Sequence, residues 1–313
     1  MLVNRCFRTF VPLLKAAIRL LFRKTLTAKT SKACAFIAFL SATLIGGGCF
    51  DKNAEQKGQR VAPERLQGKI RLAGSSTMAP LVEALGKRFR ALHPEVAIEV
   101  ATGGSSRGIH DVREGSCNIG MVGRSLKDDE RDLLGFPIAR DGVCLIVHKD
   151  NPVKSLSSGQ VVGIYTGKIT NWKEVGGNDA AIMSINRPEG RAQSELFTQF
   201  FKIKSEDFKV GGVAGDNQEG VKAVVENPNA IVYMSVGEVD IRIGQGVPIK
   251  SLLMDGITAT SRNIRNGHFP IQRPLMLVMR TFPSGVMKAF IDFALSPNAT
   301  EIIRECSFVP YLD

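Results

Sequence analysis

The chain has 313 residues, 44% of them hydrophobic and 23% charged, which is typical of a globular protein with two lobes and unlike a disordered or fibrous chain. Its formal net charge is +11, but eight of its 41 Lys and Arg residues lie within residues 1–48, which contain no Asp or Glu. The remaining 33 basic and 30 acidic residues leave a net charge of +3, so a nucleic-acid partner is not expected.

Residues 1–48 are predicted to be an export leader. A basic region precedes the apolar run 33–45, which has the length of a signal-peptide core and is too short to span a bilayer. Three glycines then lead to Cys49, which resembles the acylated cysteine of bacterial lipoproteins, although Gly46 stands where that pattern has a leucine-like residue. We expect lipidation at Cys49, with ordinary cleavage nearby as the alternative, and a location in the periplasm or on the outer face of a bacterial membrane.

The segment 49–68 is polar and predicts a tether before the first folded strand. Beyond it, short apolar runs alternate with helical patterns, which predicts an α/β fold. In the first block, strands are expected at 70–74, 96–102, 118–123 and 142–149, and helices at 78–92, 107–115 and 127–134.

A second α/β block is expected after residue 148, with strands at 181–186 and 230–235 and helices at 194–201 and 219–227. The last predicted strand and helix, at 273–279 and 284–296, must pack against another part of the protein, and we expect them to pack against the first block. We therefore predict lobe 1 from residues 69–147 plus 247–313 and lobe 2 from residues 148–246, joined by two crossing strands. This layout leaves a cleft between the lobes, where ligands usually bind.

Three turns rich in glycine and serine follow predicted strands and begin predicted helices, at 74–77, 103–108 and 190–194. A helix N-terminus exposes unpaired N–H groups and the positive end of the helix dipole, so each turn can bind an anion. One such turn more often only caps its helix. Three of them, with Arg124 and Arg187 nearby, favour an oxyanion site, and none has the lysine of a nucleotide-binding loop.

The second turn also satisfies the GxSxG pattern of a nucleophile elbow, with Ser106 as the nucleophile. His268 lies in a predicted loop and could complete a triad, but no HGGG-type oxyanion motif precedes the turn. A serine hydrolase with Ser106 as nucleophile therefore stays as a third hypothesis. The preferred interpretation is a binding protein with no catalytic residue.

Cysteine and histidine spacing predicts neither a metal site nor a cofactor, because the histidines do not cluster and no CxxC pair occurs. Cys117 and Cys144 lie in or beside apolar runs and are expected to be buried free thiols.

Five segments together resemble the phosphate-binding proteins of bacterial phosphate ABC transporters: AGSSTMAPLVEAL, TGGSSRGI, EGSCNIGMVGRSLKDDE, IARDGVCLIVHKDNPVKSL and IYTGKITNWKEVGG. The similarity runs from about residue 70 to the end and implies the two-lobed periplasmic-binding-protein fold, type II. It implies a receptor that closes on inorganic phosphate in an interlobe cleft and delivers it to an ABC transporter permease. A monomer is expected, because the fold needs no partner to complete its cores.

The ligand set implied by this resemblance departs from the family pattern in two places. After the third strand the family usually reads IGMSSR, whereas this chain reads IGMVGR and keeps only Arg124. The turn before the lobe 2 helix usually reads GSGT, and here Arg191 and Gln193 replace its two hydroxyl residues. The expected ligand-binding residues are Ser75, Ser76, Thr77, Ser105, Ser106, Arg124, Arg187, Gly190, Arg191 and Gln193.

These departures leave the ligand open between inorganic phosphate and a related oxyanion. A signalling or adhesion receptor of the same fold with an altered ligand is the second hypothesis. Protonated phosphate also favours a buried acceptor for its proton, for which Asp141 and Glu189 are candidates by their proximity to the motifs.

Overall fold

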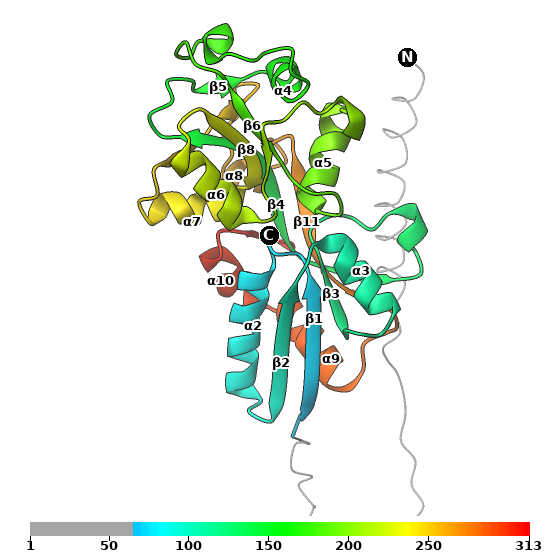
Figure 1. Ribbon diagram of the computed structural model, residues 1–313. Helices are drawn as coiled ribbons and strands as arrows, with labels where there is room; N and C mark the ends of the chain where they lie inside the picture. The colour runs from blue at the N-terminus through cyan, green and yellow to red at the C-terminus, as the bar shows by residue number, and fades with distance from the viewer. Residues whose placement is uncertain (1–64) are drawn as a thin grey trace, which may run out of the picture. The chain divides into compact units, whose positions relative to one another are not determined.

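The computed structural model describes residues 65–313 (Figure 1). The predictions for the leader, for most of the tether and for Cys49 lie outside the described residues. Among the helices of the described part, none combines the length and the apolar character that a membrane crossing requires.

The first part of the sheet is parallel and is built from three strands that two helices connect. Strand β1 (Gly68–Gly74) lies between β2 (Val96–Thr102) and β3 (Ile119–Val122), and helices α2 (Ala79–Leu92) and α3 (Ser105–Arg113) make the connections. Pro80 lies in the first turn of α2, where its missing N–H group leaves no hydrogen bond unmade.

A 15-residue strand, β4 (Leu134–His148), links this part of the sheet to the second. Its first half pairs with β11 (Gln272–Met279) and its second half with β8 (Ala230–Ser235), both antiparallel. With β6 (Met183–Asn186) and β7 (Gly212–Val213), the strand order is β2-β1-β3-β11-β4-β8-β6-β7. Figure 1 shows β1, β2 and α2 at one end of the described part of the chain, and β6 with β5 (Ser155–Leu156) and α4 (Ser158–Tyr165) at the other.

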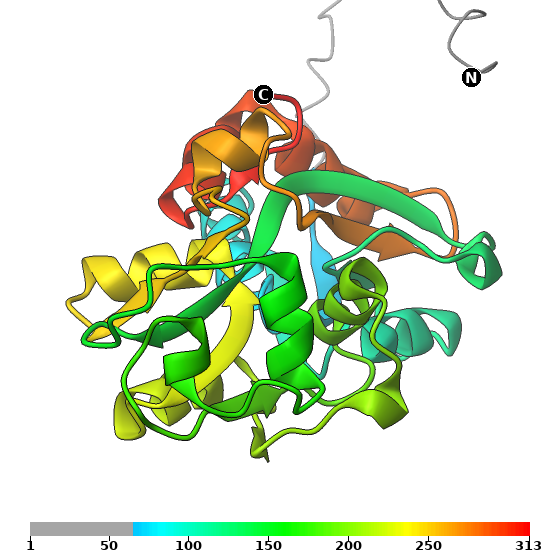
Figure 2. The ribbon, with the colours of Figure 1, turned by 90° about the horizontal axis from the view of Figure 1, so that it is seen from above.

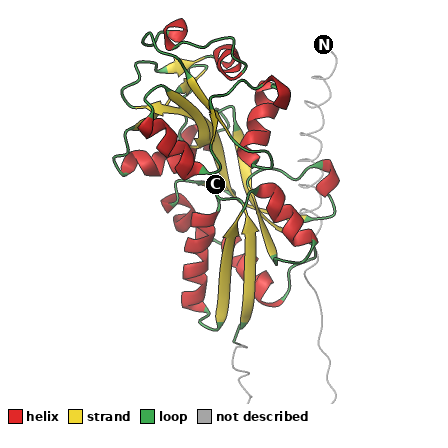
Figure 3. Ribbon diagram, in the orientation of Figure 1, coloured by secondary structure: helices red, strands yellow, loops and turns green. Residues whose placement is uncertain are grey.

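The remaining elements flank this sheet, and helices cover the strands in both parts (Figure 3). Two short strands, β9 and β12, pair with β4, and β5 pairs with β10 in a separate small sheet. The bounds are β5 (Ser155–Leu156), α4 (Ser158–Tyr165), η2 (Trp172–Val175), α5 (Ala192–Phe201), η3 (Ser205–Asp207), α6 (Asn217–Glu226), α7 (Val236–Gly244), β9 (Ile249–Ser251), β10 (Leu253–Met254), α8 (Ser261–Arg265), α9 (Gly285–Leu295), α10 (Pro297–Glu305) and β12 (Val309–Pro310).

Two large hydrophobic clusters form the interior. One joins β1, α2, β11, α9 and α10, with Phe89 and Phe290 edge to face at its centre. The other lies around Tyr233 and the buried Trp172, and it includes the apolar residues from Ile249 to Ile271. The chain passes between the clusters along β4 and again at the start of β11, which runs beside β4 in Figure 2. The result is a two-lobed α/β arrangement in which both ends of the described chain share one cluster.

Two local predictions differ from the structure. Residues 127–134 were expected to form a helix, but only one 3₁₀ turn, η1 (Asp128–Glu130), forms before Leu134 begins β4. The Glu130 carboxylate accepts hydrogen bonds from the Lys127 N–H group at 2.8 Å and from Arg124, and these bonds hold a tight turn in place of a helix. Helix α10, which begins at Pro297, was not predicted as a separate helix.

Candidate functional site: three turns in the cleft

The three predicted turns lie where strands end and helices begin, and the structure brings them together. The 74–77 turn precedes α2, the 103–104 turn precedes α3, and the 190–191 turn precedes α5. The Ser106 N–H group donates to the Gly190 carbonyl at 3.3 Å, although these residues belong to different lobes. Arg191 Nη1 donates to Ser76 Oγ at 3.5 Å, and Gln193 Nε2 to Thr77 Oγ1 at 3.3 Å.

Two polar grooves adjoin these contacts and mark the cleft between the lobes. One, of about 630 Å³, is lined from both lobes by residues that include Arg124, Lys127, Glu195 and Arg273. The other, of about 220 Å³, is lined by residues that include Ser76, Thr102, Asp216 and Asn217. Of the residues in the three turns, Ser76 lines the second groove, and none lines the first.

The first turn depends on a glycine. Gly74 has φ +134°, and a Cβ atom there would lie 2.3 Å from the Met121 carbonyl oxygen. That carbonyl also accepts a hydrogen bond from the Ser75 N–H group at 2.8 Å. The close packing of this turn on β3 buries Ser75 and Thr77 and leaves Ser76 half-buried.

Thr77 carries a hydroxyl group that is oriented by two donors. Its Oγ1 atom accepts from Gln193 Nε2 and from Arg273 Nη2, both at 3.3 Å. A hydroxyl oxygen has two lone pairs, and here both accept hydrogen bonds. The hydroxyl group can then make one further hydrogen bond, in which it donates its own proton. Thr77 is thus prepared to donate to an acceptor such as an oxyanion.

The serines of the second turn face different partners. Ser105 is buried, and its Oγ accepts the Gly123 N–H group at 3.0 Å, which leaves its own proton to donate. Ser106 is half-buried, and its Oγ donates to Glu195 Oε1 of α5 at 3.1 Å. Because its N–H group is bonded to Gly190, both donors of Ser106 are engaged with the other lobe.

Arg187 is a buried cation in the second lobe. Its Nε donates to the Tyr233 carbonyl at 3.3 Å and its Nη1 to the carbonyls of Ala214 and Asp216, directly before α6. Among residues 65–313, its Nη2 atom is buried without a hydrogen-bond partner, and no ion pair includes its guanidinium. Burial lowers the pKa of Arg187 to about 10, so it stays charged at neutral pH.

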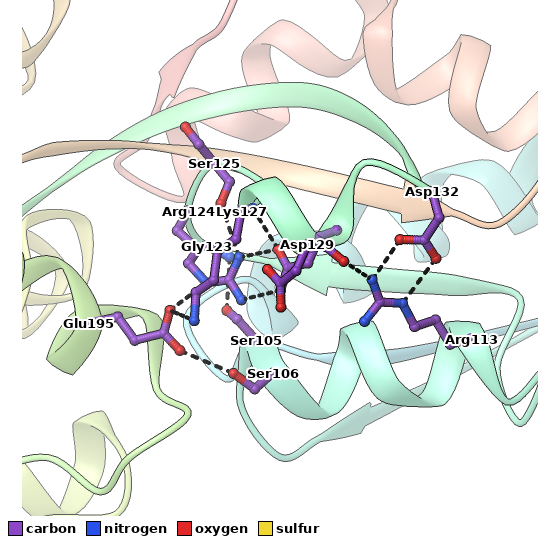
Figure 4. Close-up of polar contacts among 11 residues, drawn as sticks. Ser105, Ser106, Arg113, Gly123, Arg124, Ser125, Lys127, Asp129, Asp132 and Glu195 are labelled. Carbon is purple, nitrogen blue, oxygen red and sulfur yellow. Dashed lines mark hydrogen bonds and ion pairs between the residues drawn. The ribbon is translucent and has the colours of Figure 1, made fainter.

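Arg124 has its charge balanced within the protein, as Figure 4 shows. Two guanidinium nitrogens donate to the two oxygens of Glu130, at 2.7 and 2.8 Å, and Nε lies 2.6 Å from Glu195 Oε2. The Nε–H group is not aligned for a hydrogen bond to Glu195, so this contact is an ion pair. Burial would raise the pKa of Glu130, but hydrogen bonds from Arg124 and from the Lys127 N–H group lower it.

Arg273 was not predicted as a site residue, and it lies in a fully buried ion pair. Its Nη2 is 2.8 Å from Asp141 Oδ2, and both side chains are 1% exposed. Asp141 also accepts the Gly237 N–H group at 3.3 Å, so this acceptor candidate is already occupied, and the other, Glu189, is exposed. The signal in the sequence was one charged residue in each of two apolar segments, whereas their pairing as Cα partners across β4 and β11 comes from the fold.

Asn217, the first residue of α6, is the other unpredicted residue here. It accepts from Gln193 Nε2 at 3.1 Å, so Gln193 links Thr77 of one lobe to α6 of the other. Its signal in the sequence was weak, since it is one amide among many.

The hydrolase hypothesis finds no triad in this geometry. His268 is exposed in the segment between α8 and β11, and the hydroxyl of Ser106 is bonded to a carboxylate. Within residues 65–313, no group of three or more His, Cys, Asp or Glu residues is placed to hold a metal ion. Cys117 and Cys144 are buried free thiols, as expected.

Comparison with known proteins assigns a family. The family model described as PBP superfamily domain matches residues 59–298. The phosphate-binding protein PstS of Bacillus subtilis is 27% identical over 282 residues, which are 88% of this chain and 92% of that protein. The PstS protein of Staphylococcus haemolyticus is 30% identical over 246 residues, 74% of this chain and 77% of that protein.

A solved structure gives the same result. It is a substrate-binding protein from Clostridium perfringens, assigned to a phosphate ABC transporter and crystallised with bound phosphate. It is 36% identical, with a TM-score of 0.72, and the match covers 78% of this chain and 99% of that one. The predicted resemblance and the two-lobed fold are thereby confirmed.

Proposed function

The chain belongs to the PBP superfamily and, within it, to the phosphate-binding proteins, and we propose that it captures inorganic phosphate outside the cytoplasm for the permease of an ABC transporter. The observation that carries this proposal is Arg187. A buried guanidinium without a carboxylate partner is costly, and the N-termini of α5 and α6 beside it add positive potential. An anion bound among the three turns would offset that cost.

We propose that the ligand is held by the donors that the turns leave available. These are the hydroxyls of Thr77 and Ser105, the Arg187 guanidinium, and the helix N-termini at the 74–77 and 190–193 turns. Ser75, Ser76, Gly190, Arg191 and Gln193 belong to those turns and are part of the same proposal. The predicted roles of Ser106 and Arg124 are less well supported, because both have carboxylate partners.

The two hydrophobic clusters support a specific division into lobes. Ile249, Phe269 and Ile271 pack with the cluster of Tyr233, whereas Leu275 and Leu277 pack with that of Phe89. We propose that the lobes divide near Asp141 and Arg273. Residues 247–271 would then belong to lobe 2 and not, as the sequence suggested, to lobe 1.

Export and anchoring complete the proposal. The relatives are named as phosphate-binding proteins, and the basic and apolar pattern of residues 1–48 supports export. We propose that Cys49 carries a lipid that holds the receptor at the membrane, and that the receptor acts as a monomer and performs no reaction on its ligand.

Isothermal titration calorimetry on the exported protein tests the function. We expect one phosphate per chain with micromolar or tighter affinity, and titration with sulfate at the same concentrations measures the selectivity of the site. Binding of another solute without any binding of phosphate would contradict the proposal and favour a receptor of the same fold with an altered ligand. Ester hydrolysis that is lost in His268→Ala would instead favour the hydrolase.

A further inference from the structure

Glu195, on the lobe 2 helix α5, contacts three side chains of the other lobe (Figure 4). Its Oε1 accepts the hydroxyl of Ser106 at 3.1 Å. Its Oε2 lies 2.6 Å from Arg124 Nε and 3.1 Å from Lys127 Nζ. One carboxylate therefore joins α5 to α3 and to the segment after β3.

One partner of Glu195, Arg124, is fixed within its own lobe. Arg124 donates to both oxygens of Glu130 and to the Ser125 carbonyl, so its guanidinium is held in place without any contribution from α5. A preorganised cation loses little side-chain entropy when a carboxylate docks on it. Closure of the lobes thus brings Glu195 onto a prepared site.

This contact is shielded from water more than an ordinary surface ion pair. The side chain of Arg124 is 8% exposed and that of Glu195 is 22% exposed. Charge pairs with low exposure are screened less by solvent and salt than exposed pairs, which contribute little. The contact with Glu195 is therefore strong enough to affect the closed state.

The same geometry makes Arg124 a poor ligand for an anion. Its charge is shared by Glu130 and Glu195, and a third negative group beside these two carboxylates would be repelled. Arg124 was predicted to bind the ligand, but this geometry favours a role in closure of the lobes.

We propose that Glu195 is a positioning residue that latches the two lobes over the bound anion through Ser106, Arg124 and Lys127. The proposal rests on the proposed phosphate-binding function. Glu195 does not touch the ligand in this scheme. It slows ligand release by stabilising the closed arrangement.

The test compares phosphate kinetics of the exported wild-type protein with those of Glu195→Gln. Glutamine keeps the size of the side chain and an acceptor for Ser106 but removes the charge that faces Arg124 and Lys127. We expect phosphate to dissociate about tenfold faster, with an association rate within about twofold of wild type, because loss of a shielded charge pair acts mainly on dissociation. Glu206→Gln is the matched control: Glu206 lies on η3, outside the three turns, is exposed, and its substitution should leave both rates unchanged.

A double-mutant cycle with Lys127→Met separates a latch from a general structural effect. Lys127 is 48% exposed, so its substitution should not impair folding. The effects of Glu195→Gln and Lys127→Met on dissociation should be less than additive, whereas those of Glu206→Gln and Lys127→Met should add. Additive effects in the first pair, or a dissociation rate equal to wild type in Glu195→Gln, would overturn the latch.

Failure of the proposed function gives a different result. If wild-type protein does not bind phosphate, the function is wrong, and small-angle X-ray scattering still tests the latch. We then expect a larger radius of gyration for Glu195→Gln than for wild type and for Glu206→Gln. Equal radii in that case would overturn the latch as well.

Discussion

At the scale of single residues, the cleft contains two arginines that are buried to a similar degree but differ in how their charge is balanced. Arg273 has Asp141 at 2.8 Å, whereas Arg187 has backbone carbonyls and a free Nη2 atom. A buried ion pair balances its own charge, so removing one partner is costly, whereas a buried cation without a counter-ion favours an anionic ligand. This difference leads to opposite predictions for the two positions.

Replacing Arg187 should affect binding more than stability. In Arg187→Met the phosphate affinity is expected to fall by about 100-fold or more, equivalent to roughly 3 kcal/mol, because a charged donor to the anion is lost. The phosphate affinity of Arg187→Lys should lie between those of wild type and Arg187→Met, since lysine keeps the charge but lacks the several N–H donors of a guanidinium. Calorimetry measures the affinity. Thermal unfolding in the absence of phosphate measures the stability, which should change little.

The control for Arg187 is Arg262→Met. Arg262 is exposed on α8, and its removal changes the net charge equally without altering the cleft. An equal loss of phosphate affinity in both variants would show that long-range charge, not a specific site, is being measured.

Replacing Asp141 should affect stability. Asp141→Asn leaves Arg273 buried without a counter-charge, and the free energy of unfolding is expected to fall by about 3–5 kcal/mol. Asp292→Asn is the matched control, because it removes an exposed pair with Lys288 and should cost about 0.5 kcal/mol or less. Urea denaturation of both variants measures the difference, and similar losses would contradict a structural role for the buried pair.

At the scale of elements, α3 lies close to the sheet, and glycine makes this possible. A Cβ atom at Gly108 would lie 2.8 Å from the Ala73 carbonyl oxygen and 3.1 Å from both Gly74 Cα and the Met121 carbonyl oxygen. The N-terminus of α3, which carries Ser105 and Ser106, is thereby held against the ends of β1 and β3. The same substitution should therefore have opposite effects in α3 and in a helix with more space.

Gly108→Ala is expected to destabilise the protein by about 1–3 kcal/mol, because the added methyl group meets backbone atoms that cannot move aside. Gly159→Ala in α4 should instead stabilise it by up to about 1 kcal/mol, since only Ser157 Oγ lies near the new atom, at 3.9 Å, and alanine favours a helix. Chemical denaturation measures both. A stabilising Gly108→Ala would mean that α3 does not pack against β1 and β3 as described.

Element boundaries differ from those that the sequence predicts where side-chain contacts outweigh the local pattern. The acidic segment 127–134 has the composition of a helix start, but Glu130 is drawn back to Arg124 and to the Lys127 N–H group, and the chain turns into β4 instead. Strand β8, by contrast, has the bounds that its apolar run predicts, because every residue of the run is buried.

At the scale of the whole molecule, ligand binding should appear as thermal stabilisation. A ligand that binds only the folded protein adds about 2.7 kcal/mol of stability at 100 times its Kd. For a domain of this size we expect the melting temperature to rise by about 5–10 °C with phosphate at that concentration. Differential scanning calorimetry measures the shift, and an equal shift with sulfate would show that the binding is not specific to phosphate.

Anchoring is also a property of the whole protein. In the producing bacterium, Cys49→Ser is expected to abolish incorporation of labelled fatty acid and to move the protein from the membrane to the soluble extracytoplasmic fraction. Unchanged labelling, or labelling that is absent in the wild type, would favour ordinary signal cleavage. Cys306→Ser serves as the control, because Cys306 lies at the end of α10.

The sequence alone determined the α/β class, the order of most elements, the three turns, and the resemblance to phosphate-binding proteins. It could do so because apolar periodicity, glycine positions and strand-to-helix turns are local properties of the chain. Only the tertiary structure decided which donors remain available in the cleft. Arg124 and Ser106 are occupied by Glu130 and Glu195, Arg187 is buried without a counter-ion, and Arg273 pairs with Asp141, which lies 132 residues away. Charge balance depends on which residues meet when distant segments pack, and no local pattern contains that information.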